Sequence, residues 1–310
     1  MISRAGLYAG LLGIGLAWGA SIPAIKVATS TGHGPLGLVF WQLAISVLVL
    51  GLVIVARGGS LRLRRADLAF FLVIGAIGTV VPNFFSYTAA RELPAGVMAI
   101  VIAMVPIFAF PIALLLRIER WEVGRILGLL LGAAAVTAIA APEASLPDAG
   151  ATFFVFFALI GPLCYGVEGN YLAIRGERGL DPVKVLFGGS ILGLALATPL
   201  VLATGQWVPV PTGAWTDADR AVVVVGLLHA LAYAGYVWLV AQAGPVFAAQ
   251  VSYLVTGAGV LWSMLLLGER YSLWVWAALI LILLAMALVQ PRARTLEPRA
   301  PARHGVQPRA

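Results

Sequence analysis

Ten long apolar stretches run along this 310-residue chain, each bounded by charged residues, Pro/Gly turns or polar clusters. Their approximate bounds are 6–27, 35–56, 67–89, 94–116, 122–141, 151–174, 182–203, 220–241, 246–267 and 272–290. A helix needs about 20 apolar residues to cross the hydrocarbon core of a bilayer. Transmembrane β-strands are about ten residues long and alternate in polarity, which these stretches do not. The sequence therefore predicts an all-α polytopic membrane protein with ten transmembrane helices.

The composition excludes the main soluble classes. Hydrophobic residues make up 61% of the chain, charged residues 11%, and the mean hydropathy is +1.00, whereas a soluble domain carries about 25% charge. The net charge of +7 could indicate a nucleic-acid partner, but the basic residues are scattered between apolar blocks, as in the loops of membrane proteins. We therefore expect the lipid bilayer, and no nucleic acid, as a partner. The first stretch is too long for the apolar region of a signal peptide, and we interpret it as a retained helix.

Basic residues divide unevenly between the two sets of loops. With the N-terminus in the cytoplasm, sixteen of the 20 Lys and Arg residues fall on the cytoplasmic side and four on the other. Because cytoplasmic loops of membrane proteins carry an excess of Lys and Arg, we expect both termini to be cytoplasmic. Residues 291–310 are rich in Pro and Arg, which favours a disordered tail.

The two halves of the chain resemble each other. The run LPAGVMAIVIAMVPIFAFPIALLLRIER (93–120) matches AGPVFAAQVSYLVTGAGVLWSMLLLGER (243–270), and LAWGASIP (16–23) matches LCYGVEGN (163–170). The match pairs Glu119 with Glu269 and Trp18 with Tyr165. Residues 6–141 and 151–290 each hold five stretches, and an odd number inverts the second repeat relative to the first. Inverted repeats are typical of secondary transporters, whose substrate lies near the midplane between the repeats.

The chain is similar to the drug/metabolite transporter superfamily, specifically to proteins with two tandem EamA-type domains. The resemblance rests on AWGASIPAIK early in the first repeat, on LLLRIE and LLLGE at the ends of the two fourth helices, and on the Gly-rich fifth helix GRILGLLLGAAAV. It implies a small-molecule exporter or exchanger of the inner membrane, without naming a substrate. The second repeat departs from the first in its basic residue, which follows Tyr165 by ten positions, and in lacking a counterpart of Pro106.

Glu168 and His229 are the candidates for proton coupling. Of the 13 acidic residues, Glu168 is the one well inside an apolar stretch, where ionisable groups are costly and usually functional. Removal from water favours its neutral form, so a proton could be exchanged there at physiological pH. The alternative for Glu168 is a structural hydrogen bond to a neighbour. His229 lies near the middle of 220–241, and for it a role as an ordinary interhelical hydrogen-bond partner remains equally open.

Further polar and aromatic side chains fall at matching depths, where aromatic rings suit amphipathic or cationic solutes. The expected substrate-binding residues are Trp18, Ser21, Asn83, Tyr87, Tyr165, Glu168, Tyr171, His229, Tyr233, Gln250 and Tyr253. A phosphorylated solute is disfavoured because the basic residues lie at helix ends and in loops. We therefore expect a small amphipathic solute such as an amino acid or a related metabolite.

Several other residues have structural interpretations. Lys26 has two possible roles, as an interfacial anchor or as a gate. Glu119 and Glu269 are expected to tie helix ends to loops. Gly161–Pro162 is the best candidate hinge, since a proline inside a helix frees a backbone carbonyl.

The sequence predicts an exporter that works by alternating access, with no cofactor and no metal. The alternative classes are an intramembrane enzyme and a lipid-processing or assembly protein. The chain contains no HExxH, GxSxG or metal-ligand cluster, and no GxxxxGK[ST] phosphate loop, motifs that intramembrane hydrolysis or ATP drive would favour. The sequence neither predicts nor excludes a homodimer.

Overall fold

The computed structural model describes residues 3–140, 150–175, 179–243 and 245–289. Within these ranges the chain forms ten helical rods and no strand. The first repeat holds α1 (Arg4–Ala28), α2 (Pro35–Ala56), a third rod of η1 (Arg65–Asp67), α3 (Leu68–Gly75), η2 (Ala76–Val80) and α4 (Val81–Glu92), a fourth of α5 (Ala95–Ile102) and α6 (Val105–Leu115), and α7 (Val123–Ala140). The second holds α8 (Ala151–Ala158) with α9 (Ile160–Arg175), α10 (Pro182–Ala203), α11 (Asp217–Ala243), α12 (Pro245–Ala248) with α13 (Val251–Leu267), and α14 (Leu273–Val289).

The rods confirm the predicted polytopic helical fold. Among the described residues, eight rods are long and apolar enough to cross a membrane, and the last two contain apolar helices of 17 residues. The predicted bounds 35–56 and 182–203 coincide with α2 and α10. Both helices begin with a proline that fixes the first turn, after Gly34 in α2 and after Asp181, whose carboxylate caps Val183 N–H, in α10. The tail 291–310 lies outside the described residues.

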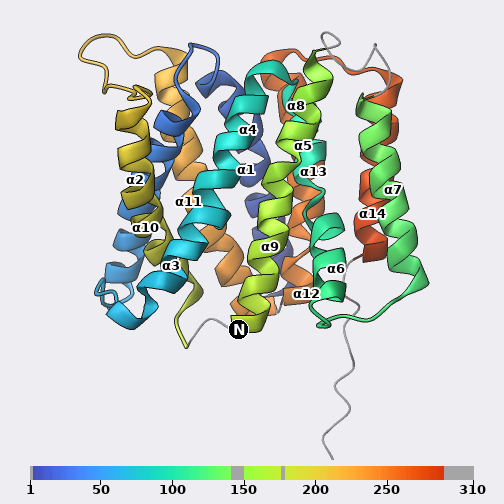
Figure 1. The fold of residues 1–310 in the computed structure, drawn as a ribbon, viewed down its shortest axis with the longest axis horizontal. Coiled ribbons are helices and arrows are strands. Elements are labelled where there is room, and N and C mark those ends of the chain that lie inside the picture. Colours follow the sequence, from blue (N-terminus) through green and yellow to red (C-terminus); the bar gives the residue numbers. More distant parts are fainter. Residues whose placement is uncertain (1–2, 141–149, 176–178, 244, 290–310) are drawn as a thin grey trace, which may run out of the picture.

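The second repeat is inverted relative to the first. In Figure 1 the chain enters α1 from the lower face, where the N-terminus lies, whereas α8 begins at the upper face. Packing follows the same exchange: α1 packs on α13 and α11, and its counterpart α9 packs on α6 and α4. The pair α10–α3 matches α2–α11, and the pairs α7–α14 and α2–α10 join equivalent rods. The two repeats are therefore related by an approximate twofold axis that runs perpendicular to the helices.

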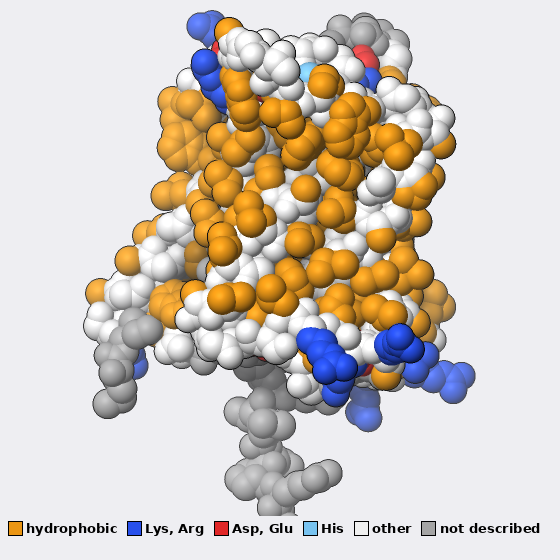
Figure 2. Space-filling model, turned by 90° about the vertical axis from the view of Figure 1, so that its left-hand side faces the viewer, with side chains coloured by type: hydrophobic (Ala, Val, Ile, Leu, Met, Phe, Trp, Pro, Cys, Tyr) orange, Lys and Arg blue, Asp and Glu red, His pale blue; other side chains and the backbone are white. Residues whose placement is uncertain are grey.

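The surface and the core both fit a bilayer environment. Figure 2 shows a broad hydrophobic band on one face of the molecule, with Lys and Arg side chains gathered at its lower edge and fewer at its upper edge. The largest buried cluster draws its buried side chains mainly from α5, α6, α8 and α14, with fewer from α4, α7 and α13. The largest apolar core of the bundle therefore surrounds the fourth and tenth rods. The remaining rods carry the polar residues described below.

Four rods are not continuous α-helices. The fourth rod breaks at Ala103–Met104, just before Pro106, and the sixth breaks at Leu159, just before the predicted hinge Gly161–Pro162. The ninth rod breaks at 249–250, a position that the sequence analysis did not anticipate. The third rod contains the π-helical segment η2 directly before Pro82. Wide turns of this kind open the backbone and occur often at functional sites.

Candidate substrate site

A network of buried hydrogen bonds joins α2, α4 and α9 at mid-depth. The Tyr165 hydroxyl donates to Asn83 Oδ1 (3.0 Å), and Asn83 Nδ2 donates to Gln42 Oε1 (3.1 Å). The Tyr87 hydroxyl donates to the same Gln42 oxygen. Asn83, Tyr87 and Gln42 are each at most 6% exposed. The network therefore links both repeats and fixes the orientation of three predicted site residues, Asn83, Tyr87 and Tyr165.

Gln42 belongs to this site although the sequence analysis did not single it out. Its side-chain oxygen accepts two hydrogen bonds, while its amide N–H₂ donates none to any described residue and is not fully enclosed. A buried amide with spare donors is costly unless it meets water or a ligand. The available signal was a lone amide side chain in the otherwise apolar stretch 35–56.

Glu168 lies one helical turn beyond Tyr165 on α9 and rests against the third rod. A methyl group added at Gly78, inside η2, would collide with both carboxylate oxygens of Glu168. Pro82 has no N–H to bond the Gly78 carbonyl four residues earlier, so the backbone is already irregular at this contact. No hydrogen bond or ion pair joins the carboxylate to another described residue. An acidic group without a partner among the described residues therefore lies within the bundle.

Trp18, His229 and Tyr236 form an aromatic cluster between α1 and α11. The Trp18 ring meets His229 edge-on at 6.3 Å and Tyr236 edge-on at 6.3 Å, measured between ring centroids. Gly19 allows the close approach of α1 to α13, because a Cβ there would lie 2.7 Å from the Ala258 Cβ. The indole N–H of Trp18 and the ring nitrogens of His229 have no hydrogen-bond partner among the described residues. Their polar atoms are therefore available to a solute.

The other predicted site residues are more scattered. Ser21 donates a hydrogen bond to the Trp18 carbonyl of its own helix (2.6 Å). Tyr171 stacks on Phe70, with 6.0 Å between the ring centroids. Tyr253 packs against the largest apolar cluster, and Gln250 is exposed at the break before α13. Tyr233 lies 6.4 Å from Tyr236, measured between ring centroids, and contacts the α2–α10 cluster. The structure groups Asn83, Tyr87 and Tyr165, and separately Trp18 and His229, but does not bring Ser21, Tyr171, Gln250 or Tyr253 into either group.

A small pocket lies above the network toward the upper face. Its lining residues are Ile25, Ala28, Leu38, Tyr87, Val222 and Val225. Tyr87 thus belongs both to this apolar pocket and to the polar network beneath it. In this conformation the recess has room for about one water molecule.

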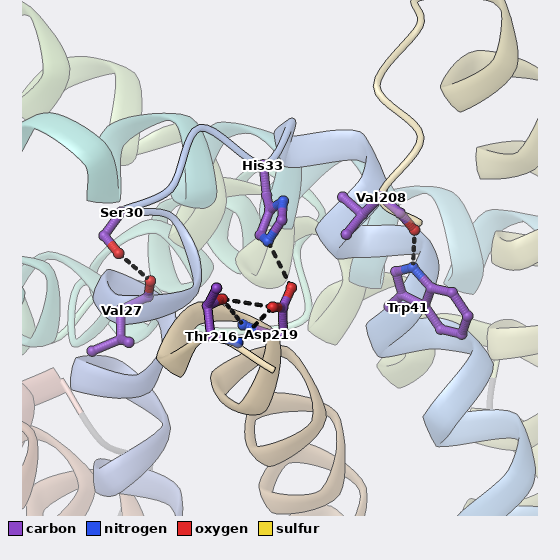
Figure 3. Close-up of polar contacts among 7 residues, drawn as sticks. All are labelled: Val27, Ser30, His33, Trp41, Val208, Thr216 and Asp219. Carbon is purple, nitrogen blue, oxygen red and sulfur yellow. Dashed lines mark hydrogen bonds and ion pairs between the residues drawn. The ribbon is translucent and has the colours of Figure 1, made fainter. Parts of the chain in front are cut away.

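Polar contacts tie the upper ends of the two repeats together. Figure 3 shows His33 and Asp219 pointing toward each other, with His33 Nε2 3.2 Å from the carboxylate and Thr216 bonded to the same carboxylate. Trp41 Nε1 donates to the Val208 carbonyl (2.8 Å). These bonds hold the 204–216 loop against the start of α2.

Lys26 serves as an anchor in this structure. Its ammonium group donates to the carbonyl oxygens of Arg91 (2.8 Å) and Leu93 (3.0 Å), the end of the third rod. A cation at a helix C-terminus satisfies carbonyls that lack partners within the helix. No group of three or more possible metal ligands occurs among the described residues.

The fold and site define a polytopic membrane protein built from two inverted five-helix repeats around a polar interior. The model of the EamA-like transporter family matches residues 6–141 and 152–290, and the chain belongs to this family of transporters. A solved protein described only as "Crystal structure of protein" is 22% identical, with a TM-score of 0.59, and the alignment covers 96% of this chain and 100% of that chain. That likeness supports the fold alone. No curated protein matches the chain.

Proposed function

We propose that this transporter is a proton-coupled secondary carrier that exports small amphipathic solutes with an amino group, such as amino acids. The observation that carries the proposal is the Glu168 carboxylate, which lies within the bundle and has no partner in the part of the chain that the structure describes. An acidic group inside a membrane is retained at a cost, and such groups mark proton relays and substrate partners. The Trp18–His229 cluster and the spare amide donors of Gln42 supply an aromatic surface and hydrogen bonds for the rest of the solute.

The basic residues support amino compounds over sugar phosphates. Lys26 is occupied by two backbone carbonyls, and the buried Arg125 pairs with Glu119 and Glu122 at the lower end of α7. A phosphate group needs Arg or Lys where it binds, and neither side chain reaches the network around Gln42 and Asn83.

Solute binding provides a direct test. Purified protein is titrated in parallel with amino acids and with sugar phosphates, and stabilisation against heating is measured, because a ligand that binds the folded state raises the apparent melting temperature. We expect stabilisation by amino compounds alone. Trp18→Ala and His229→Ala should each raise the ligand concentration needed for the same stabilisation by about tenfold, which corresponds to a loss of roughly 1.4 kcal/mol of binding free energy. Tight sugar-phosphate binding, or binding indifferent to both substitutions, would contradict the proposed site.

We further propose that the lower face is cytoplasmic in the inner membrane. The loops at that face include Arg57, Arg62, Arg64, Arg117 and Arg120, in agreement with the positive-inside rule. A reporter fused after residue 290 should be active only in the cytoplasm, and one inserted between 142 and 150 only outside. Activity of the first reporter outside the cytoplasm would overturn this orientation.

A further inference from the structure

A clamp joins the fourth and ninth rods at the upper face. The Glu269 carboxylate, just beyond α13, accepts hydrogen bonds from the backbone N–H groups of Ala95 (2.9 Å) and Gly96 (3.2 Å), at the start of α5. The Tyr271 hydroxyl donates to the same carboxylate (2.5 Å) and accepts from Gly96 N–H (3.1 Å). Burial and the neighbouring carboxylate raise the pKa of Tyr271, so its hydroxyl remains a donor. We call Glu269, Tyr271 and the start of α5 the upper clamp.

The helices below the upper clamp are packed together. Helix α5 packs on α13, and Ala99 at their interface is 1% exposed. A Cβ added at Gly259 would lie 2.9 Å from the Ala99 Cβ. The upper halves of the fourth and ninth rods therefore leave no path between them.

The equivalent positions at the lower face are not joined. The repeat match places Glu119 on Glu269 and, at the same offset, Trp121 on Tyr271. Glu119 instead pairs with Arg125 of its own repeat (3.0 Å), and Trp121 is 77% exposed. Helix α6 packs mainly on α9, and α12 packs on α11. Ala249, the counterpart of Ala99, is only partly buried, and the adjacent Gln250 is exposed.

We propose that these two positions are alternating gates, that the structure is the state closed at its upper face, and that Glu119 and Trp121 clamp the segment beginning at Pro245 when the upper clamp opens. The inference rests on the proposed carrier function and deepens it. Two inverted repeats of similar sequence move against each other when the carrier turns over, so a contact made by one repeat predicts a related contact in the other. The match at the same offset places Pro245 on Ala95 and Val246 on Gly96. Pro245 has no N–H, so the Val246 N–H is the backbone donor available to Glu119, and the Trp121 indole N–H can donate to the same carboxylate. Arg125 holds Glu119 in the present state and keeps Glu122 as a partner (3.5 Å) when Glu119 leaves.

Cysteine accessibility tests the gates without any substrate. In the full chain with Cys164→Ser, Ala99→Cys and Ala249→Cys are introduced separately, and their reaction rates with a charged maleimide are measured in detergent, where both faces meet the reagent. Glu269→Gln keeps the size of the side chain but weakens its charge-assisted bonds. It should raise the labelling rate of the Ala99→Cys variant by about tenfold and lower that of the Ala249→Cys variant. Tyr271→Phe should act in the same direction more weakly.

Glu119→Gln is the matched control, because it weakens the gate that is open in this structure. It should leave the Ala99→Cys variant protected and the Ala249→Cys variant reactive. Faster labelling at both positions with Glu269→Gln, or no change at either, would overturn the proposal. Opposite changes in labelling at the two positions, without flux of amino compounds, would support the gates and contradict the proposed substrate. Flux of amino compounds without opposite changes in labelling would contradict the gates alone.

Discussion

The Glu168→Gln variant is expected to remain folded in detergent and to lose transport. Glutamine keeps the shape of the side chain but can neither release a proton nor carry a negative charge. Hydrogen bonds to charged groups contribute about 1.5–3 kcal/mol, so the apparent affinity for an amino compound should fall by roughly 10–100-fold. Any residual flux into proteoliposomes should no longer depend on a pH gradient. Both quantities are measured with purified protein reconstituted at several pH values.

Gly78→Ala provides a second variant that leaves the acidic group in place. The new methyl group would occupy the position of the Glu168 carboxylate, and because that carboxylate ends a flexible side chain, the protein can respond by turning the side chain away. We expect a folded protein with weakened transport that still responds to pH. Wild-type pH dependence in Glu168→Gln would instead make Glu168 a structural residue.

Much of the fold was predictable because a bilayer imposes simple rules on sequence. A spanning helix must be long and apolar, which placed the bounds of α2 and α10 and the general course of every rod. The match between LLLRIE and LLLGE predicted the repeat, and the odd number of rods in each half predicted its inversion. Prolines marked two of the breaks because they remove a backbone donor.

The candidate site was predictable only in part, because its contacts depend on which sides of the helices pack against each other. Asn83 and Tyr165 are 82 positions apart, and nothing in their spacing shows that they bond. Tyr171 and Gln250 have the same chemical character as Tyr165 and Gln42 but point elsewhere. The segment η2 was missed because Ala76–Val80 reads as ordinary apolar helix, and its π-helical turn becomes visible only in the structure.

Glu119 and Glu269 show why a correct repeat does not settle a contact. Both were interpreted as tying a helix end to a loop, and Glu269 does bond the start of α5. Its counterpart has the same identity and position in the repeat but a different partner, Arg125. Sequence similarity between inverted repeats therefore predicts which contacts each repeat can form. A single conformation of the protein contains only one of two equivalent contacts.

Gly75→Ala is expected to produce the largest loss of stability of any substitution considered. Gly75 ends α3 directly before η2, where α3 crosses α10. An added Cβ would lie 2.6 Å from Gly193 N and 2.9 Å from Gly193 Cα, and it would also collide with the Gly189 carbonyl. All three neighbours are backbone atoms of a helix that is itself packed on α2, so no side chain can rotate to make room.

The whole helix pair must therefore separate, and overpacking of this kind costs about 1–3 kcal/mol or more. For a chain of this size we expect the apparent melting temperature in detergent to fall by roughly 5–10 °C. Gly257→Ala is the matched control, since nothing lies within 4 Å of its Cβ position on α13, and alanine favours the helix over glycine. Its melting temperature should equal or slightly exceed that of the wild type. Equal stability of the two variants would show that α3 and α10 are not in backbone contact, and the third rod would then lose its support beneath Gly78 and Glu168.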